Sequence, residues 1–253
     1  MYLSYLLQGL WELMYPPRRA CPLCGSQTSK GEICPHCLQW VRRHGSGPVC
    51  PVCGRFINLP SVGPCNHGRH PCPICASQAP AFNAARAVGP YEGVLRDAIL
   101  HLKSKGTRRV AAALGELAAE VVHREPAFAA AELIIPVPLA PRRLARRGFN
   151  QAQLLALELG NLIELPVDTK AVAKVRETKP QIGLSRYERE RNLIDAFAVI
   201  TPETVYGKRI LLIDDVLTTG ATMDNISIKL RRHQPSTILA LTAAGGKAGV
   251  SFV

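Results

Sequence analysis

The sequence lacks the features that mark secreted and membrane proteins. Residues 76–253 contain no cysteine, so disulfides cannot stabilise that part of the chain. The apolar start, residues 2–14, includes Gln8 and Glu12 and is too short for a membrane-spanning helix, which needs about 20 apolar residues. We find no basic segment followed by an apolar stretch and a cleavage site. These absences predict a cytoplasmic protein with reduced thiols and no integral membrane segment.

Acidic residues are also few. The chain has 19 Asp and Glu against 31 Lys and Arg, a formal net charge of +12. A Zn²⁺ ion held by four thiolates carries about −2, so two such sites would leave roughly +8. This balance suits an anionic partner such as nucleic acid or a polyphosphate, and it suits equally a protein with a basic surface. The 253 residues suffice for one α/β core and a small accessory domain.

The nine cysteines lie between Cys21 and Cys75, and eight of them form Cys-x-x-Cys pairs. These pairs are Cys21/Cys24, Cys34/Cys37, Cys50/Cys53 and Cys72/Cys75. This spacing lets two thiolates reach one ion from a tight turn, and two such turns complete a tetrahedron around Zn²⁺. Four thiolates leave no open coordination position. We therefore predict one or two zinc sites that are structural rather than catalytic.

The grouping of the pairs has two solutions. We favour sequential grouping of neighbouring pairs, while interleaved grouping, first with third and second with fourth, fits the spacing too. Cys65 has no partner pair and is either a spare thiol or, like His67 and His70, a substitute ligand. A redox role is the rival interpretation, but four clustered pairs exceed what an oxidoreductase needs.

Changes in composition predict three parts. Residues 1–16 are expected to form an amphipathic helix that docks on its own domain, or on a membrane or partner. Residues 17–78 form a zinc-binding, cysteine-rich domain, and residues 79–253 form an α/β domain. In this last part we expect helices at 92–103, 108–123, 150–163 and 221–232, and strands at 133–138, 209–214 and 236–244. Short apolar strands between helices predict a mostly parallel sheet flanked by helices. Leu154, Leu155, Leu159 and Leu162 are expected on one face of the third helix.

The most informative segment is 209–222. A buried strand leads to Asp214 and Asp215, a turn of small residues follows, and then a helix begins. Consecutive backbone N–H groups at a helix N-terminus bind phosphate. The residues that would provide them are Thr218, Thr219, Gly220, Ala221 and Thr222. Two carboxylates beside that phosphate suit the 2- and 3-hydroxyls of a ribose 5-phosphate, whereas the alternative is a pair of aspartates capping an ordinary helix.

This segment resembles the signature of type I phosphoribosyltransferases that binds phosphoribosyl pyrophosphate (PRPP). The resemblance implies a phosphoribosyltransferase-like fold and binding of PRPP together with Mg²⁺. Enzymes acting on 6-oxopurines usually have Asp at the position of Thr218, where it contacts the base. A threonine there argues against a hypoxanthine–guanine salvage enzyme.

Two further segments carry candidate ligand contacts. Arg142, Arg143, Arg146 and Arg147 can hold a pyrophosphate through paired N–H donors, or form a solvated basic face or a nucleic-acid contact. Residues 178–186 are either a loop that closes over a charged substrate or a plain surface loop. Its candidates are Lys179, Gln181, Ser185 and Arg186. We take Asp214, Asp215, Lys179 and Arg186 as the catalytic candidates.

Together these segments resemble the ComF competence-protein family, whose members join a cysteine-rich zinc region to a type I phosphoribosyltransferase domain. The matching stretches are 21–75, 91–93, 102–103, 135–151, 176–192 and 211–222. Lys103, in the matching Leu102-Lys103 pair, joins the PRPP-binding candidates, although Ser104 replaces an aromatic residue common in the family. The resemblance implies a role in natural transformation, with single-stranded DNA and a competence helicase as partners. It leaves open an enzyme or a binding module without turnover.

Overall fold

The structure, a computed structural model, describes residues 19–57, 71–178, 193 and 195–247. Our expectations for the 1–16 helix, for Cys65, His67 and His70, and for most of the 178–186 loop lie outside these ranges. Within them, no helix pairs enough length with enough apolar character to span a bilayer.

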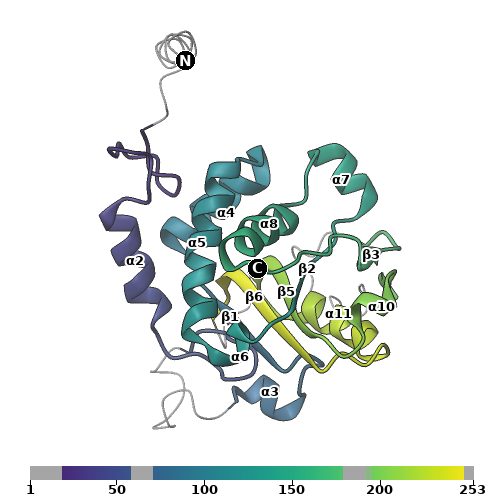
Figure 1. Cartoon of the computed structure of the whole chain (residues 1–253). Helices are drawn as coiled ribbons and strands as arrows, with labels where there is room; N and C mark the ends of the chain where they lie inside the picture. Colours follow the sequence, from purple (N-terminus) through teal and green to yellow (C-terminus); the bar gives the residue numbers. More distant parts are fainter. Residues whose placement is uncertain (1–18, 58–70, 179–192, 194, 248–253) are drawn as a thin grey trace.

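A four-stranded parallel sheet forms the centre of the molecule (Figure 1). Its order is β1 (Ala84–Ala87), β6 (Thr237–Gly245), β5 (Arg209–Leu217) and β2 (Leu133–Pro136). A separate antiparallel pair is formed by β3 (Val172–Lys174) and β4 (Phe197–Val199). Together with the helices on both faces and the N-terminal cysteine-rich region, this sheet confirms the predicted fold class.

The two faces of the sheet carry different helices because side chains alternate along each strand. Leu211 and Ile213 face α4 (Gly93–Lys105), α5 (Arg108–Arg124) and α8 (Gln151–Ile163). Ile210 and Leu212 face the opposite core, which includes α11 (Ala221–Arg231). Strands β5 and β6 are therefore buried on both sides over most of their length, as their continuous apolar sequences predict.

The expected helix at 150–163 is present, but its buried face differs from the prediction. Leu155 and Leu159 are buried, whereas Leu162 is 49% exposed. The buried surface of α8 is completed by small residues, among them Ala156 and Gly160. A Cβ on Gly160 would lie 2.5 Å from the Val167 side chain, so this helix packs too closely for a larger residue. The predicted face of leucines is therefore buried at Leu155 and Leu159 and not at Leu162.

Short helices were not expected from the sequence. They are α2 (Pro35–Gly45), α3 (Pro73–Ser77), α6 (Pro126–Ala129), α7 (Pro141–Arg147) and α10 (Pro202–Val205). All of them begin at a proline, whose fixed φ and missing N–H suit the first helical position. A proline therefore marks the first residue of each of these five helices.

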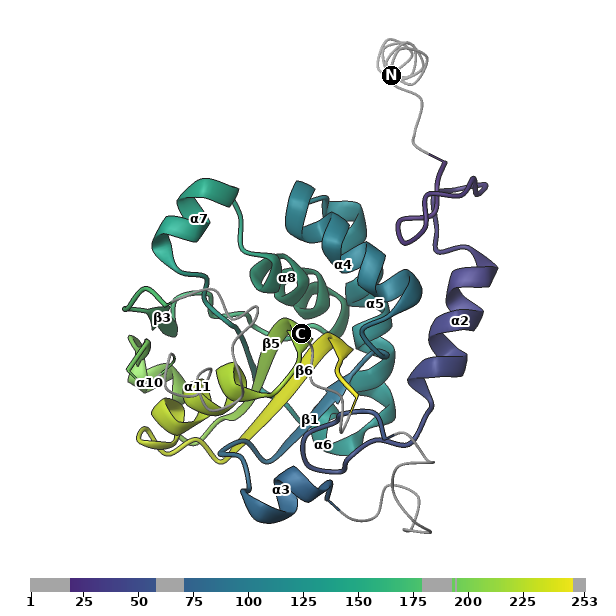
Figure 2. The same cartoon turned by 180° about the vertical axis from the view of Figure 1, so that it is seen from behind.

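The cysteine-rich region contacts both faces of the sheet. Its first part packs on α4 and α5, where Arg109 donates a hydrogen bond of 3.0 Å to the carbonyl of Gly31. Its second part reaches the edge strand β1, and Phe56 forms a bridge with Lys247 after β6. Gly54 has a φ of 65°, and a Cβ there would lie 2.4 Å from the carbonyl oxygen of Ala85. The second cysteine turn is therefore packed directly against the sheet, as Figure 2 shows from behind.

Candidate functional site

The two aspartates lie where the sheet becomes narrower. The pairing of β2 with β5 stops at Ile213, whereas β5 continues beside β6 as far as Leu217. Our predicted strand ended at Asp214, so the strand is longer than expected and the aspartates lie within it. They follow the last residue paired with β2, which leaves that edge of β5 free to present them.

Their side chains lie in different environments. Asp215 is only 5% exposed, and its Oδ2 lies 3.2 Å from Nζ of Lys103 on α4. Asp214 is half-buried, and its Oδ1 accepts a 2.8 Å hydrogen bond from the backbone N–H of Asp215. Burial and the neighbouring Asp215 carboxylate raise the pKa of Asp214 to about 8, against the opposing effects of that N–H, Lys103 and Lys174. The pair thus combines one ion-paired carboxylate with one that holds its proton near neutral pH.

The turn after β5 forms a small pocket together with Asp214. It is lined by residues 214 and 216–223. Gly220 has a φ of 85°, a conformation that glycine adopts without strain, and it precedes the first turn of α11. The N–H of Ala221 lies 3.3 Å from Oγ1 of Thr219. The first residues of this helix of 11 residues, where backbone N–H groups can bind an anion, therefore line the same pocket as Asp214.

The four predicted arginines divide into two pairs. Arg142 and Arg146 are exposed, whereas Arg143 and Arg147 are half-buried, as expected for residues four apart on one face of α7. Burial lowers the pKa of Arg147, Asp215 opposes that shift, and Arg143 and Arg146 add to it. The sequence made no distinction among the four arginines. In the structure Arg147 is near enough to Asp215 to feel its charge, and Arg143 is near Lys174.

Lys174 on β3 is a charged group near the site that the sequence did not suggest. Burial and the neighbouring Arg143 lower its pKa, while Glu177 and Asp214 oppose that shift. Its Nζ donates a 2.8 Å hydrogen bond to Oγ1 of Thr178 and lies 5.4 Å from the centre of the Phe197 ring. No motif marks this lysine, because only the fold brings β3 beside the aspartates.

The structure describes some of the remaining candidate residues and not others. Lys103 reaches the site, as described above. The predicted residues Lys179, Gln181, Ser185 and Arg186 lie outside the described residues, so their roles stay predictions.

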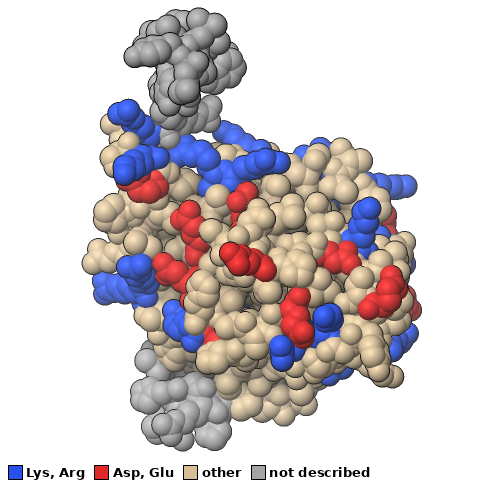
Figure 3. Space-filling view, viewed as in Figure 1, with Lys and Arg blue, Asp and Glu red and all other residues tan. Residues whose placement is uncertain are grey.

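On the face in Figure 3, Lys and Arg side chains gather along the upper edge, while acidic side chains are scattered over the middle. This edge adds to the basic character expected of a protein with an anionic partner.

The eight paired cysteines form two clusters of four sulfur atoms. One contains Cys21, Cys24, Cys34 and Cys37, and the other contains Cys50, Cys53, Cys72 and Cys75. Within each cluster all sulfurs lie within 4.8 Å of one another, which fits a tetrahedral Zn²⁺ site. This is the sequential grouping.

Hydrogen bonds to the sulfurs support the metal interpretation. The backbone N–H of Cys34 lies 3.4 Å from Sγ of Cys21, and that of Cys72 lies 3.3 Å from Sγ of Cys50. Such donors stabilise thiolates and are typical of zinc ribbons. The donor sets therefore fit structural zinc.

Comparisons with known proteins agree with both parts. Residues 10–76 match the double zinc ribbon domain family. The chain is 34% identical to DNA utilization protein YhgH of Shigella flexneri, over 86% of this chain and 93% of the relative. It is 32% identical to competence protein F of Haemophilus influenzae, over 81% of this chain and 86% of that one. A solved purine phosphoribosyltransferase of Pyrococcus horikoshii matches 52% of this chain and 72% of that chain, with 14% identity and a TM-score of 0.33.

Proposed function

The chain belongs to the ComF family, that of competence protein F and DNA utilization protein YhgH, and from this premise we propose that it binds PRPP with Mg²⁺. One observation carries the proposal: the first residues of α11 and Asp214 line the same pocket. A phosphate cradle alone needs no carboxylate. A ribose 5-phosphate needs both a phosphate cradle and a carboxylate, because it has an anionic phosphate and two neighbouring hydroxyls.

Each part of PRPP has a proposed binding site in the protein. The turn of residues 218–222 binds the 5-phosphate through backbone N–H groups and hydroxyls. Asp214 and Asp215 accept hydrogen bonds from the two ribose hydroxyls. Arg143 and Arg147 bind the pyrophosphate, whose charge Lys103 and Lys174 help to balance. The oxygen-rich pyrophosphate and carboxylates suit Mg²⁺, which would neutralise charge on the leaving group when bound.

For the reaction we propose departure of pyrophosphate from C1 of the sugar and attack by a nitrogen nucleophile. The residues of the chain would act by positioning PRPP and by stabilising negative charge on the leaving pyrophosphate. The biological role proposed for this chemistry is the handling of single-stranded DNA in natural transformation, with a competence helicase as partner. The relatives called DNA utilization protein and competence protein F support a role in competence and the use of DNA, and the helicase rests on the family resemblance alone.

A calorimetric titration with PRPP and Mg²⁺ tests binding, and a pyrophosphate-release assay with nucleobases and single-stranded DNA tests turnover. We expect binding and release with at least one acceptor. Binding without release across the panel would reject the transferase reaction and retain the binding module. No binding at all would reject the proposal.

Protonation of Asp214 should make PRPP binding pH-dependent. With a pKa of about 8, only about one tenth of this carboxyl is ionised at pH 7, and about nine tenths at pH 9. If the ionised form accepts the ribose hydroxyl, affinity rises by up to about tenfold over that interval. Calorimetry from pH 6.5 to 9 measures this, and Asp214→Asn controls for titration of the ligand itself. Parallel profiles for both proteins would contradict the assignment.

The raised pKa of Asp214 makes PRPP affinity rise with pH, and it makes the free energy of unfolding change in the opposite direction. The folded state keeps the Asp214 proton to a higher pH than the unfolded chain does, so the contribution of this group to stability falls as pH rises from about 4 to 8.

The two faces of α7 should differ in their contribution to PRPP binding. We expect Arg143→Ala with Arg147→Ala to weaken PRPP binding by about tenfold or more, since each removes a charge-assisted hydrogen bond. The matched control is Arg142→Ala with Arg146→Ala, which removes the same charge from the exposed face and should change affinity less than about threefold. Equal losses in both variants would show that net charge alone matters. The measurement is the dissociation constant for PRPP at fixed ionic strength.

A further inference from the structure

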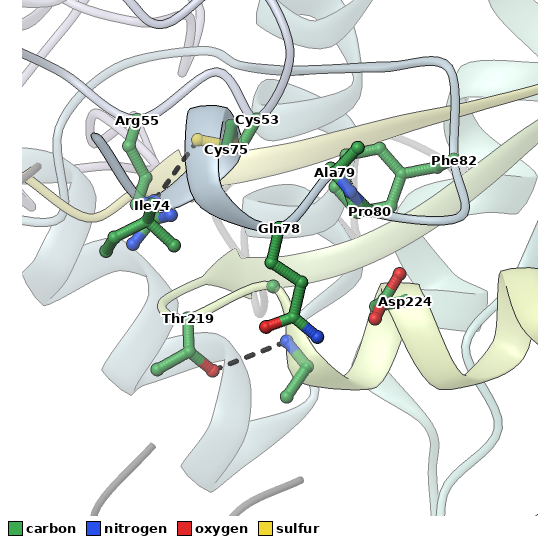
Figure 4. Close-up of a pocket in the computed structure, with 12 residues that line it drawn as sticks. Cys53, Arg55, Ile74, Cys75, Gln78, Ala79, Pro80, Phe82, Thr219 and Asp224 are labelled. Atoms are coloured by element: carbon green, nitrogen blue, oxygen red, sulfur yellow. Dashed lines mark hydrogen bonds between the residues drawn. The ribbon is translucent and has the colours of Figure 1, made fainter. Parts of the chain in front are cut away.

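A second cavity lies between the phosphate-binding turn and the second cysteine cluster. Thr219, Gly220 and Ala221 line it from one side, and Arg55 and Gln78 line it from the other (Figure 4). The same three turn residues also line the pocket that contains Asp214. The turn therefore lines both the proposed ligand pocket and a cavity that the second cysteine cluster also lines.

Arg55 connects this cavity to the second cluster. It is 6% exposed, its Nε lies 3.2 Å from Sγ of Cys53, and its Nη2 lies 3.9 Å from Sγ of Cys72. A Zn²⁺ ion with four thiolates carries about −2, and a buried arginine hydrogen-bonded to the sulfurs offsets part of that charge. The metal site therefore fixes the orientation of Arg55 through these sulfurs. Of the two clusters among the described cysteines, the second is the one that lies this close to the guanidinium group.

The chain that follows Cys75 contacts α11 directly. The N–H of Ala81 donates a 2.6 Å hydrogen bond to Oδ1 of Asp224, in the first turn of α11. The carbonyl of Ala81 accepts a 2.7 Å hydrogen bond from Nε of Arg231, in the last turn. The Phe82 ring lies 4.0 Å from the position that a Cβ on Gly220 would occupy. These contacts hold the start of α11, and with it the turn, to a segment that begins at a zinc ligand.

The first cluster has a different environment. Cys21 and Cys37 belong to the core on the α4 and α5 face of the sheet. The cysteines of the second cluster belong to the opposite core, which also contains Ala221 and Met223. Loss of metal from the two clusters should therefore have different consequences for the turn.

We propose that metal at the second cluster positions the phosphate-binding turn, with Arg55 and residues 78–82 as positioning residues. The second cluster, unlike the first, would thereby set the affinity for a sugar 5-phosphate. The ligand in this statement rests on the proposed function, whereas the coupling between cluster and turn does not.

Amide hydrogen exchange tests the coupling without any ligand. Cys75→Ser removes a ligand of the second cluster, and Cys24→Ser, its matched control, removes an exposed ligand of the first. We expect faster exchange in peptides covering residues 218–224 for Cys75→Ser and unchanged exchange there for Cys24→Ser. Similar exchange of the turn in both variants would overturn the proposal.

Variants that retain all eight ligands test the effect on binding, and they cover the case in which Cys75→Ser does not fold. Arg55→Met should keep the zinc content of the wild type and weaken PRPP binding by about tenfold, the scale expected for groups that orient metal ligands. Arg109→Met is its control, because that arginine holds the first cysteine segment to α5. An unchanged dissociation constant in Arg55→Met would overturn the proposal. If the wild type binds no PRPP, the proposed function fails, and the exchange result alone decides the coupling.

Discussion

Replacing Asp214 and Asp215 together with Asn lowers the affinity for PRPP by at least about a hundredfold, and the protein stays folded. At pH 9, where Asp214 is ionised, each carboxylate is proposed to accept a hydrogen bond from a ribose hydroxyl, and hydrogen bonds to charged groups contribute about 1.5–3 kcal/mol each. Two such losses amount to roughly 3–6 kcal/mol, which is about two orders of magnitude or more in the dissociation constant.

The fold should tolerate this change for reasons that the structure supplies. Asn matches the shape of Asp and retains the side-chain oxygen that accepts the 2.8 Å hydrogen bond from the N–H of residue 215. Burial and the Asp215 charge both raise the pKa of Asp214 and so disfavour its ionised form, and a neutral Asn at this position therefore removes no favourable charge. Loss of the Asp215 charge removes the partner of Lys103, whose side chain is 29% exposed and can reach water.

Calorimetry measures the affinity, and thermal melting without ligand measures the fold. Asp195→Asn is the matched control, because it makes the same chemical change at a carboxylate that is 75% exposed and paired with Lys229. The control should bind PRPP as the wild type does. A double variant with the wild-type dissociation constant would contradict the placement of the ribose.

Removing one zinc ligand of the second cluster should have the largest effect on stability. Cys50 is fully buried, and its Sγ accepts hydrogen bonds from the N–H groups of Cys53 and Cys72. A structural Zn²⁺ site contributes about 10–16 kcal/mol of binding free energy in small zinc domains, much of it to folding. Cys50→Ser should therefore reduce zinc from two ions per chain to one and lower the melting temperature by more than about 10 °C.

Metal analysis by mass spectrometry together with thermal melting checks this result. Cys65→Ser is the control, because Cys65 has no partner pair in the sequence. We expect two zinc ions in that variant. A wild-type zinc content in Cys50→Ser would refute the ligand assignment, and a loss of zinc in Cys65→Ser would show that this cysteine substitutes for one of the eight.

The central strands β5 and β6 could be predicted because their apolar sequences indicate that they are buried. Residues 210–213 and 238–241 are runs of apolar residues, and such runs indicate strands buried on both faces. The edge strand β1 could not be found this way, since Ala84-Ala-Arg-Ala has little intrinsic preference for strand. It is a strand because it pairs with β6, from Ala84 with Leu239 to Ala87 with Thr242.

The same contrast applies to the candidate site. The turn after β5 follows one strand in sequence, so its residues could be identified together. Lys174 and Arg55 come from other parts of the chain, and only tertiary packing brings them close to that turn. The division of the arginines was within reach of the sequence, because a helix starting at Pro141 places Arg143 and Arg147 on one face.

The bridge between Phe56 and Lys247 has a consequence for biosynthesis. The ribosome makes the cysteine turns early and makes β6, which lies between β1 and β5, near the end of the described chain. A nascent chain still short of residue 237 lacks the strand against which β1 and β5 both pair. Contacts between such distant residues slow folding. Early binding of zinc would keep the eight paired cysteine thiols coordinated until β6 has been synthesised.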